Sequence, residues 1–429
     1  MRPLLIALLF ASLAACDGEI GHPGQGDAGG GDTGSTGGDA GAGPDAPAED
    51  AGPADAGLAD AGPTDTGSGE DAGPTARPIG PRPVLPTPVA AGTIFAAPDG
   101  SGTACTEAAP CDVWEATAQA QAGDVVFLRG GAYVIDRNLT FEGRGTAPSP
   151  PVFESYPGEV AVLDGAPSTA SDEFYIRVVG DPVVLRLLEV RNMPRMGIAV
   201  RSSDNVLEGL HVHHNLLSGI HVHESYDVPL SNRNLIRDCE VHDNSGAGLS
   251  DPEFADGGNS DGISMSSGLG NRVENCLVYA NSDDGIDTWR TEDSYVGYSI
   301  VYGNGIAAGN GQGVKAGGAA PSRGTFVEHC LAYSNRAAGF DQNSGLEVVF
   351  AYNTSWDNER GYWSGADTVL EHNLAAETNA VGGGGISTDN SWQRTGAVAF
   401  VSVDPTSPGF LVPVPGGGFE DLGAYANRE

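Results

Sequence analysis

The chain has 429 residues, of which 64 are Gly and 28 are Pro, and its formal net charge is -36. Its length allows two or three domains. The acidic excess is uneven, because the stretch from Asp17 to Ala76 carries 13 acidic residues and neither Lys nor Arg. A nucleic-acid binder needs a basic surface to contact phosphates, so this charge excludes that class of partner. An acidic substrate would require a cation between itself and the protein.

The first 16 residues have the pattern of an export signal. Arg2 precedes the apolar run from Leu4 to Phe10, which is too short to span a bilayer. The run is followed by Leu13-Ala14-Ala15-Cys16, which resembles the bacterial lipoprotein signal. That resemblance implies acylation of Cys16 and a lipid anchor in a bacterial membrane. The alternative is an ordinary secretory signal with an incidental cysteine, and on both interpretations we expect an exported protein.

Residues 17–90 consist almost entirely of Gly, Ala, Asp, Pro, Thr and Ser. So few large apolar side chains cannot offset the entropy lost on ordering, and we therefore expect a disordered acidic linker. This linker would hold a folded domain of residues 91–429 away from the membrane that carries the anchor.

The folded domain repeats one short unit. Each unit is an alternating strand that ends near an Asn, followed by a Gly and an apolar residue. These Gly-plus-apolar pairs are Gly219-Ile220, Gly262-Ile263, Gly285-Ile286, Gly313-Val314, Gly339-Phe340 and Gly361-Tyr362. The strand units recur at roughly 20 to 37 residues, which is a solenoid period. Short β-rich units with almost no helical pattern predict an all-β parallel β-helix, whose equivalent positions stack about 4.8 Å apart.

The N-terminal end of this domain carries a predicted cap. The one convincing helical pattern runs over residues 112–122, and we expect it to cover the open end of the stack. Cys105 and Cys111 lie close together in an exported chain and predict a disulfide. Three further cysteines fall in one inward-facing column: Cys239, Cys276 and Cys330. We expect buried free thiols there, and the alternative is a disulfide between Cys239 and Cys276.

The residue after each Gly-plus-apolar pair should point outward, because side chains alternate along a strand. In chain order these residues are His221, Ser264, Asp287, Lys315, Asp341 and Trp363. Lys315 is the only lysine of the chain. We expect Asp287 one turn below it, with Asp283 and Asp284 in the corner before and Asp261 one turn lower. Clustered carboxylates require a cation, and ligands that are all oxygen select Ca²⁺. The alternative is that these aspartates are only turn residues.

Four motifs carry a resemblance to a known family. They are Asn259-Ser260-Asp261-Gly262-Ile263, Asn281-Ser282-Asp283-Asp284-Gly285-Ile286-Asp287, Asn310-Gly311-Gln312-Gly313-Val314-Lys315-Ala316-Gly317-Gly318 and Gly339-Phe340-Asp341-Gln342-Asn343. They resemble successive motifs of the family-nine polysaccharide lyases, which are Ca²⁺-dependent pectate lyases built on a right-handed parallel β-helix. The resemblance is close from Asp238 to Asn358. It implies Ca²⁺ at Asp261, Asp283, Asp284 and Asp287, and a catalytic base at Lys315. The implied activity is β-elimination in a uronate polysaccharide, pectate above all.

Several weaker candidates surround this cluster. Trp289, Arg290, Arg323 and Arg336 are candidate substrate contacts, or else ordinary surface residues. Asp341 either orients Lys315 or extends the ladder of turn residues. Two adjacent predicted strands carry five histidines: His211, His213, His214, His221 and His223. They form either a transition-metal site or a set of solvent-facing or sugar-contacting groups.

Two other functions remain open from the sequence. The aspartates could serve a glycoside hydrolase, which uses a carboxylate pair without a metal. Alternatively, the chain is a non-catalytic β-helix that binds glycans or acts as a surface scaffold around a structural Ca²⁺. On each interpretation we expect a monomer whose partner is a polysaccharide.

Overall fold

The structure is a computed structural model of the chain, and its folded unit lies within Asp71–Glu429. The described residues are 85–144, 149–166, 176–180, 182–223, 231–246, 257–307, 309–318 and 322–426. The predicted signal of residues 1–16, the lipidation site Cys16 and the predicted linker up to residue 84 lie outside them. None of the helices in these ranges has both the length and the apolar character needed to cross a membrane.

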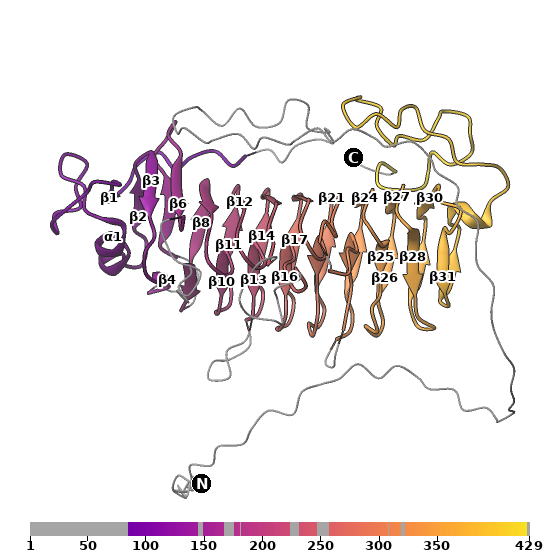
Figure 1. The fold of residues 1–429 in the computed structure, drawn as a ribbon, viewed down its shortest axis with the longest axis horizontal. Coiled ribbons are helices and arrows are strands. Elements are labelled where there is room, and N and C mark those ends of the chain that lie inside the picture. Colours follow the sequence, from indigo (N-terminus) through magenta and orange to yellow (C-terminus); the bar gives the residue numbers. More distant parts are fainter. Residues whose placement is uncertain are drawn as a thin grey trace, which may run out of the picture. The chain divides into compact units, whose positions relative to one another are not determined.

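Three parallel sheets form the folded unit, and its coils follow one another in chain order (Figure 1). We name each sheet by its first strand. The β1 sheet contains β1 (Ile94–Ala96), β2 (Val125–Leu128), β5 (Val152–Ser155), β8 (Val184–Arg186), β11 (Val206–Glu208), β14 (Leu235–Arg237), β17 (Arg272–Glu274), β20 (Tyr295–Gly297), β23 (Phe326–Glu328), β26 (Val349–Ala351), β29 (Val369–Glu371) and β32 (Ile386–Thr388).

The other two sheets have ten strands each. The β3 sheet contains β3 (Gly131–Val134), β6 (Ala161–Asp164), β9 (Leu188–Arg191), β12 (His211–His213), β15 (Glu240–His242), β18 (Leu277–Tyr279), β21 (Ile300–Tyr302), β24 (Leu331–Tyr333), β27 (Thr354–Trp356) and β30 (Leu374–Ala375). The β4 sheet contains β4 (Leu139–Glu142), β7 (Ile176–Val179), β10 (Ile198–Val200), β13 (Ile220–Val222), β16 (Ile263–Met265), β19 (Ile286–Asp287), β22 (Val314–Lys315), β25 (Ala338–Asp341), β28 (Arg360–Ser364) and β31 (Val381–Gly383).

This arrangement confirms the predicted parallel β-helix. Each strand pairs in parallel with the equivalent strands of the coils before and after it, so a given register position forms a column along the stack. Along β7 the side chains alternate between buried and half-buried, which places every second residue in the core. The inward column of the β4 sheet consists of fully buried apolar residues, such as Ile263, Ile286, Val314, Phe340 and Tyr362.

The asparagines that end the predicted units form a buried ladder inside one corner. The Nδ2 atom of Asn244 donates to Oδ1 of Asn281 at 2.9 Å, and that of Asn281 donates to Oδ1 of Asn304 at 3.0 Å. The ladder continues through Asn335 to Asn358. Each side-chain amide thus hydrogen-bonds the equivalent amide one coil away. Asn244 and Asn281 can therefore be fully buried, at 0 % exposure, without leaving polar atoms unpaired.

The predicted cap is present as α1 (Val113–Gln119), which lies beside β1, β2 and β4 at the first coil (Figure 1). The carboxylate of Asp112 accepts from the backbone N–H of Glu115 at 2.7 Å and caps the helix. A disulfide joins Cys105 to Cys111 just before this helix. The column of Cys239, Cys276 and Cys330 is buried as free thiols, so the bridge that the sequence left open is not formed.

Residues 85–90, the end of the predicted linker, lie against the β1 sheet. The backbone N–H of Val89 donates to Oε1 of Glu154 at 2.9 Å, and a guanidinium nitrogen of Arg186 donates to the carbonyl of Thr87 at 3.0 Å. Packing against the β-helix therefore begins before residue 91, because Glu154 and Arg186 offer partners for the backbone of this Pro-rich segment.

A C-terminal segment after η1 (Ser391–Gln393) covers part of the β3 sheet. Phe410, Leu411 and Ala424 pack on the outward apolar residues of β18, β21 and β24. The ring of Phe410 meets that of Tyr333 edge-on, with 4.9 Å between centroids. The outer face of these three strands is therefore a second, smaller apolar core.

Candidate active site

The outward column of the β4 sheet has the predicted register. His221 pairs with Ser264, Ser264 with Asp287, and Asp287 with Lys315. Lys315 in turn pairs with Asp341, and Asp341 with Trp363. Residues far apart in sequence thus become neighbours on adjacent coils, because each coil returns to the same position.

Gly285 allows the close approach of coils at this column. A Cβ atom at Gly285 would lie 2.2 Å from Cγ1 of Val301 and 2.7 Å from the carbonyl oxygen of Gly313 on the next coil. Only glycine fits such a space without moving the backbone. The turn that precedes β19 therefore carries Asp283 and Asp284 directly against the coil that carries Lys315.

One ammonium group meets two carboxylates at this position. The Nζ atom of Lys315 lies 2.9 Å from Oδ2 of Asp284 and 3.1 Å from Oδ2 of Asp287. Oxygens of Asp261, Asp284 and Asp287 all lie within 4.8 Å of one another, and the three residues are buried. The structure thus brings together the lysine and three of the four predicted metal ligands.

Asp283 lies in the adjoining corner and has a different environment. Its Oδ2 accepts from the backbone N–H of Asn259 at 2.7 Å, and its Oδ1 accepts from the backbone N–H of Asn310. The carboxylate thereby fixes two loops that flank the cluster. Its negative charge still acts on Asp261, Asp284 and Asp287. Its predicted role as a metal ligand stays a prediction.

The electrostatics of the cluster reflect an excess of negative charge. Burial, reinforced by repulsion from Asp283, raises the pKa of Asp284 to about 7 and that of Asp287 to about 6, although Lys315 opposes the rise. The pKa of Asp261 is raised well above its usual range by burial and by the other carboxylates. For Lys315, burial alone would lower the pKa, but the charges of Asp287, Asp284 and Asp261 outweigh burial and raise it.

This donor set fits a divalent cation. The Oδ1 atom of Asp287 is buried and has no hydrogen-bond partner, which is costly for a carboxylate oxygen. Ca²⁺ is bound by oxygens at about 2.3–2.6 Å, so two of its ligands lie at most about 5 Å apart, as the oxygens of Asp261, Asp284 and Asp287 do. Carboxylate oxygens without imidazole or thiolate favour calcium over transition metals.

Gln312 is a site residue to which the sequence assigned no role. Its backbone N–H donates to Oδ1 of Asp284 at 2.7 Å, and its side-chain Nε2 donates to Oδ2 of Asp341 at 3.2 Å. The other oxygen of Asp341 accepts from the backbone N–H of Asn343 at 2.7 Å. Asp341 thus positions Gln312 beside Asp284. The signal was its place between two glycines of the lysine motif, Gly311-Gln312-Gly313.

The predicted substrate contacts separate into two groups. Trp289 lies two residues after the end of β19, and a Cβ atom at Gly318 would be 1.7 Å from its ring. The guanidinium of Arg290 lies 5.4 Å from the centroid of the Trp289 ring, and both residues follow Asp287 closely in the chain. Arg323 instead pairs with Glu347 at 2.6 Å in the corner before β23, and Arg336 donates to the carbonyl of Ala307.

The outward column continues beyond the cluster toward the C-terminal coils. Trp363 is 39 % exposed, and the guanidinium of Arg360 lies 4.3 Å from the centroid of its ring. A half-exposed indole with an adjacent cation suits the apolar face and the carboxylate of a charged sugar.

Residues 94–378 match the family described as the Pel9A-like, right-handed β-helix region, and the chain belongs to this family. Pectate lyase L of Paenibacillus polymyxa is 29% identical in an alignment of 316 positions that covers 68% of this chain and 69% of that protein. Pectate lyase PEL9 of Emericella nidulans is 28% identical in an alignment of 403 positions that covers 78% of this chain and 95% of the relative.

Two solved structures share the fold. The crystal structure of pectate lyase Pel9A has a TM-score of 0.65 at 26% identity, over 72% of this chain and 83% of that one. A rhamnogalacturonan lyase has the same TM-score at 20% identity, over 78% of this chain and 100% of the other. These comparisons confirm the right-handed parallel β-helix and the resemblance to the family-nine polysaccharide lyases.

Proposed function

We propose that this member of a polysaccharide lyase family cleaves a pectate-like uronate polysaccharide by Ca²⁺-dependent β-elimination, with Lys315 as the base. The observation that carries the proposal is the meeting of the only lysine with buried carboxylates, one of which has an oxygen without a partner. The names of the relatives, pectate lyases at 28–29% identity, support a uronate substrate.

The carboxylates of Asp261, Asp284 and Asp287 would hold the ion, with Asp283 beside them. Calcium bound there would pair with the substrate carboxylate, stabilise the charge that develops when the neighbouring carbon loses its proton, and offset the negative charge that favours the protonated form of Lys315. Asp283 accepts from the backbone N–H of Asn259, which fixes the loop beside the ion. Gln312, whose side chain donates to Asp341, holds Asp284 in place through its own backbone N–H.

Lys315 then acts at its Nζ atom. The neutral amine takes the proton from the carbon that bears the uronate carboxylate. The electron pair left behind forms a double bond to the next ring carbon, and the glycosidic oxygen leaves that carbon with its bonding pair and acquires a proton. The products are a reducing end and an unsaturated uronate end. No water molecule attacks, so the reaction is an elimination rather than a hydrolysis.

The test is incubation with polygalacturonate, with alginate and glycosaminoglycans as parallel substrates. Unsaturated ends absorb in the ultraviolet, and we expect them from polygalacturonate with Ca²⁺ but not with chelator. Reducing ends that form without this absorbance would identify a hydrolase. Absence of turnover on all three substrates, with Ca²⁺ still bound, would favour the glycan-binding scaffold instead.

We further propose that the protein is exported and anchored through Cys16. The support is the sequence from Arg2 to Cys16 and the linker composition that follows it. A Cys16→Ser variant in a bacterial host is expected to lose incorporation of labelled lipid and to leave the membrane fraction. Lipid labelling that persists in the variant would overturn the assignment.

A further inference from the structure

A second cluster of metal-binding side chains lies on the outer face of the β3 sheet. Its register forms two columns. The first runs from Glu189 on β9 to His211 on β12 and Glu240 on β15, and the second from His213 to His242. None of these residues belongs to the candidate active site, which lies on the β4 sheet.

The imidazole nitrogens converge across adjacent coils. The Nε2 atoms of His211 and His242 lie 2.8 Å apart, and Nε2 of His213 lies 3.4 Å from Oε1 of Glu189. His211, Glu240 and His242 each offer one ligand atom within 4.8 Å of the others, and so do Glu189, His211 and His213. His211 is common to both sets and forms the centre of the cluster.

The outer nitrogens of the rings already have partners that fix their orientation. Nδ1 of His242 lies 2.6 Å from Oδ2 of Asp243, and Nδ1 of His213 lies 2.7 Å from Nδ1 of His214. A proton on Nδ1 of His242 leaves a lone pair on Nε2, directed at His211. Metal-binding histidines are held in this way by a carboxylate on the far nitrogen. The hydroxyl of Tyr279 donates to Oε1 of Glu240 at 2.9 Å and orients that carboxylate similarly.

The neighbouring coils show that these columns do not need histidine for packing. One coil beyond Glu240 and His242, the same positions are Leu277 and Tyr279. The ring of His242 stacks on that of Tyr279 at 4.6 Å, so a tyrosine ladder fills this column equally well. The two columns hold Leu277 and Tyr279 on β18, which the C-terminal segment covers, and change to Glu240 and His242 on the preceding strand, β15.

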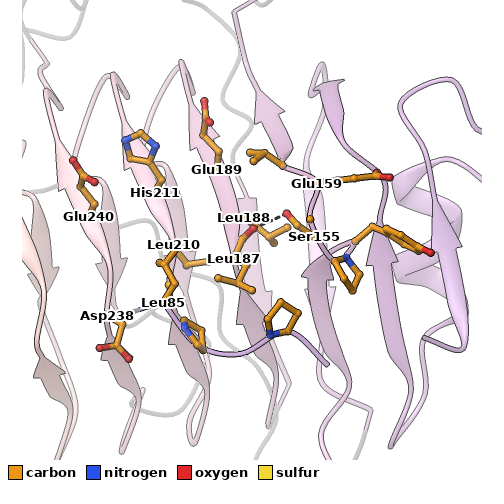
Figure 2. Close-up of a pocket in the computed structure, with 17 residues that line it drawn as sticks. Leu85, Ser155, Glu159, Leu187, Leu188, Glu189, Leu210, His211, Asp238 and Glu240 are labelled. Atoms are coloured by element: carbon orange, nitrogen blue, oxygen red, sulfur yellow. Dashed lines mark hydrogen bonds between the residues drawn. The ribbon is translucent and has the colours of Figure 1, made fainter. Parts of the chain in front are cut away.

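The cluster also has access to solvent. Glu189, His211 and Glu240 line a pocket of about 550 Å³ at the corner between the β1 and β3 sheets. Figure 2 shows these three side chains on neighbouring strands at one side of the pocket.

We propose that His211, His242 and Glu240 bind one transition-metal ion of the zinc type, with the fourth position on the side of the pocket. Two imidazoles and a carboxylate are a known set of three zinc ligands, and nitrogen ligands separate this site from a calcium site. The facing Nε2 atoms of His211 and His242 lie 2.8 Å apart, and the rings need to separate only slightly to admit the ion between them.

The experiment is titration of the tag-free protein with Zn²⁺ and with Co²⁺ in saturating Ca²⁺. We expect one Zn²⁺ per chain by calorimetry, the visible absorption of four-coordinate Co²⁺, and a Tm that rises with Zn²⁺ concentration because the ion binds only the folded state. Absence of Zn²⁺ binding to the wild-type chain would overturn the proposal.

Two variants locate the ion. His242→Tyr introduces the residue that stands at this position in the next coil, Tyr279. His211→Leu introduces the residue that stands two coils further along the same column, Leu277. Both substitutions therefore suit the columns. Each should lose the Co²⁺ absorption and the Zn²⁺-dependent rise in Tm. The matched control is His372→Tyr, because His372 is stacked on Tyr352 at 4.7 Å in another ladder. Wild-type Zn²⁺ affinity in either folded cluster variant would contradict the site, whereas Ca²⁺-dependent lyase activity is expected to persist in all three.

Discussion

The two outward clusters of this β-helix differ in chemistry although the same backbone geometry builds them. On the β4 sheet, Asp261, Asp284 and Asp287 gather around Lys315 with oxygen ligands only. On the β3 sheet, imidazoles meet carboxylates in equivalent columns. The coil spacing sets the distances in both, so the choice of side chain alone decides which ion each can hold.

The clusters also differ in how their charge is balanced. The carboxylates of the β4 sheet exceed the single positive charge of Lys315, and burial together with the other carboxylates keeps the pKa of Asp261 well above its usual range. Asp243 contacts the ring of His242, and hydrogen bonding to His213 lowers the pKa of Glu189. The first cluster therefore requires a cation to be stable in its ionised form, while contacts with imidazole rings already stabilise the ionised form of Glu189 in the second.

The largest expected effect comes from Lys315→Arg. Arginine keeps the positive charge between Asp284 and Asp287 but stays protonated, so it cannot accept a proton from the substrate. We expect kcat on polygalacturonate to fall by about 10²–10⁴-fold, the usual contribution of a general base. Unchanged thermal unfolding serves as the folding control, and substantial turnover by this variant would remove Lys315 from the mechanism.

A smaller effect is expected from Asp287→Asn, which removes one negative charge and the buried carboxylate oxygen that has no hydrogen-bond partner. The Ca²⁺ concentration needed for half-maximal activity should rise by roughly one to two orders of magnitude, because ligand charge sets the affinity. Zn²⁺ binding should not change, and this independence sharpens the contrast between the two clusters. An unaltered Ca²⁺ requirement would place the ion elsewhere.

At the second cluster, Asp243→Asn should weaken Zn²⁺ binding by about 10-fold or somewhat more, because the carboxylate that orients His242 is lost. Competition with a chromophoric chelator measures this change. The lyase rate in saturating Ca²⁺ provides the control and is expected to equal that of the wild type. Equal chelator competition by both proteins would show that Asp243 does not support a metal ligand.

The smallest effect is expected from Arg323→Ala. The guanidinium is exposed and pairs with Glu347 in a corner away from the Lys315 column. Exposed ion pairs contribute little to stability, so unfolding and KM for polygalacturonate should both stay near wild type. Arg290→Ala is the informative partner, since Arg290 lies over the ring of Trp289, two residues after Asp287, and its loss should raise KM. A raised KM in Arg323→Ala would restore its predicted contact with substrate.

Much of the candidate site followed from local regularities. The alternation of inward and outward side chains put Asp287, Lys315 and Asp341 in one column, and the Gly-plus-apolar pairs fixed their register. The environment of Asp283 could not be predicted in this way, because the backbone amides that it accepts from belong to Asn259 and Asn310 on separate loops. Gln312 escaped notice for the same reason, since its partner Asp341 is 29 residues away.

By itself the sequence determined the parallel β-helix, the capping helix and the column that holds Lys315, because strand period and turn residues act over a few neighbouring positions. Only the tertiary structure decided which oxygens of the aspartates remain available, that the C-terminal segment covers β18 to β24, and that His211 meets His242. Those outcomes depend on contacts between coils and between distant segments, where the direction of each side chain is set by packing that no local pattern encodes.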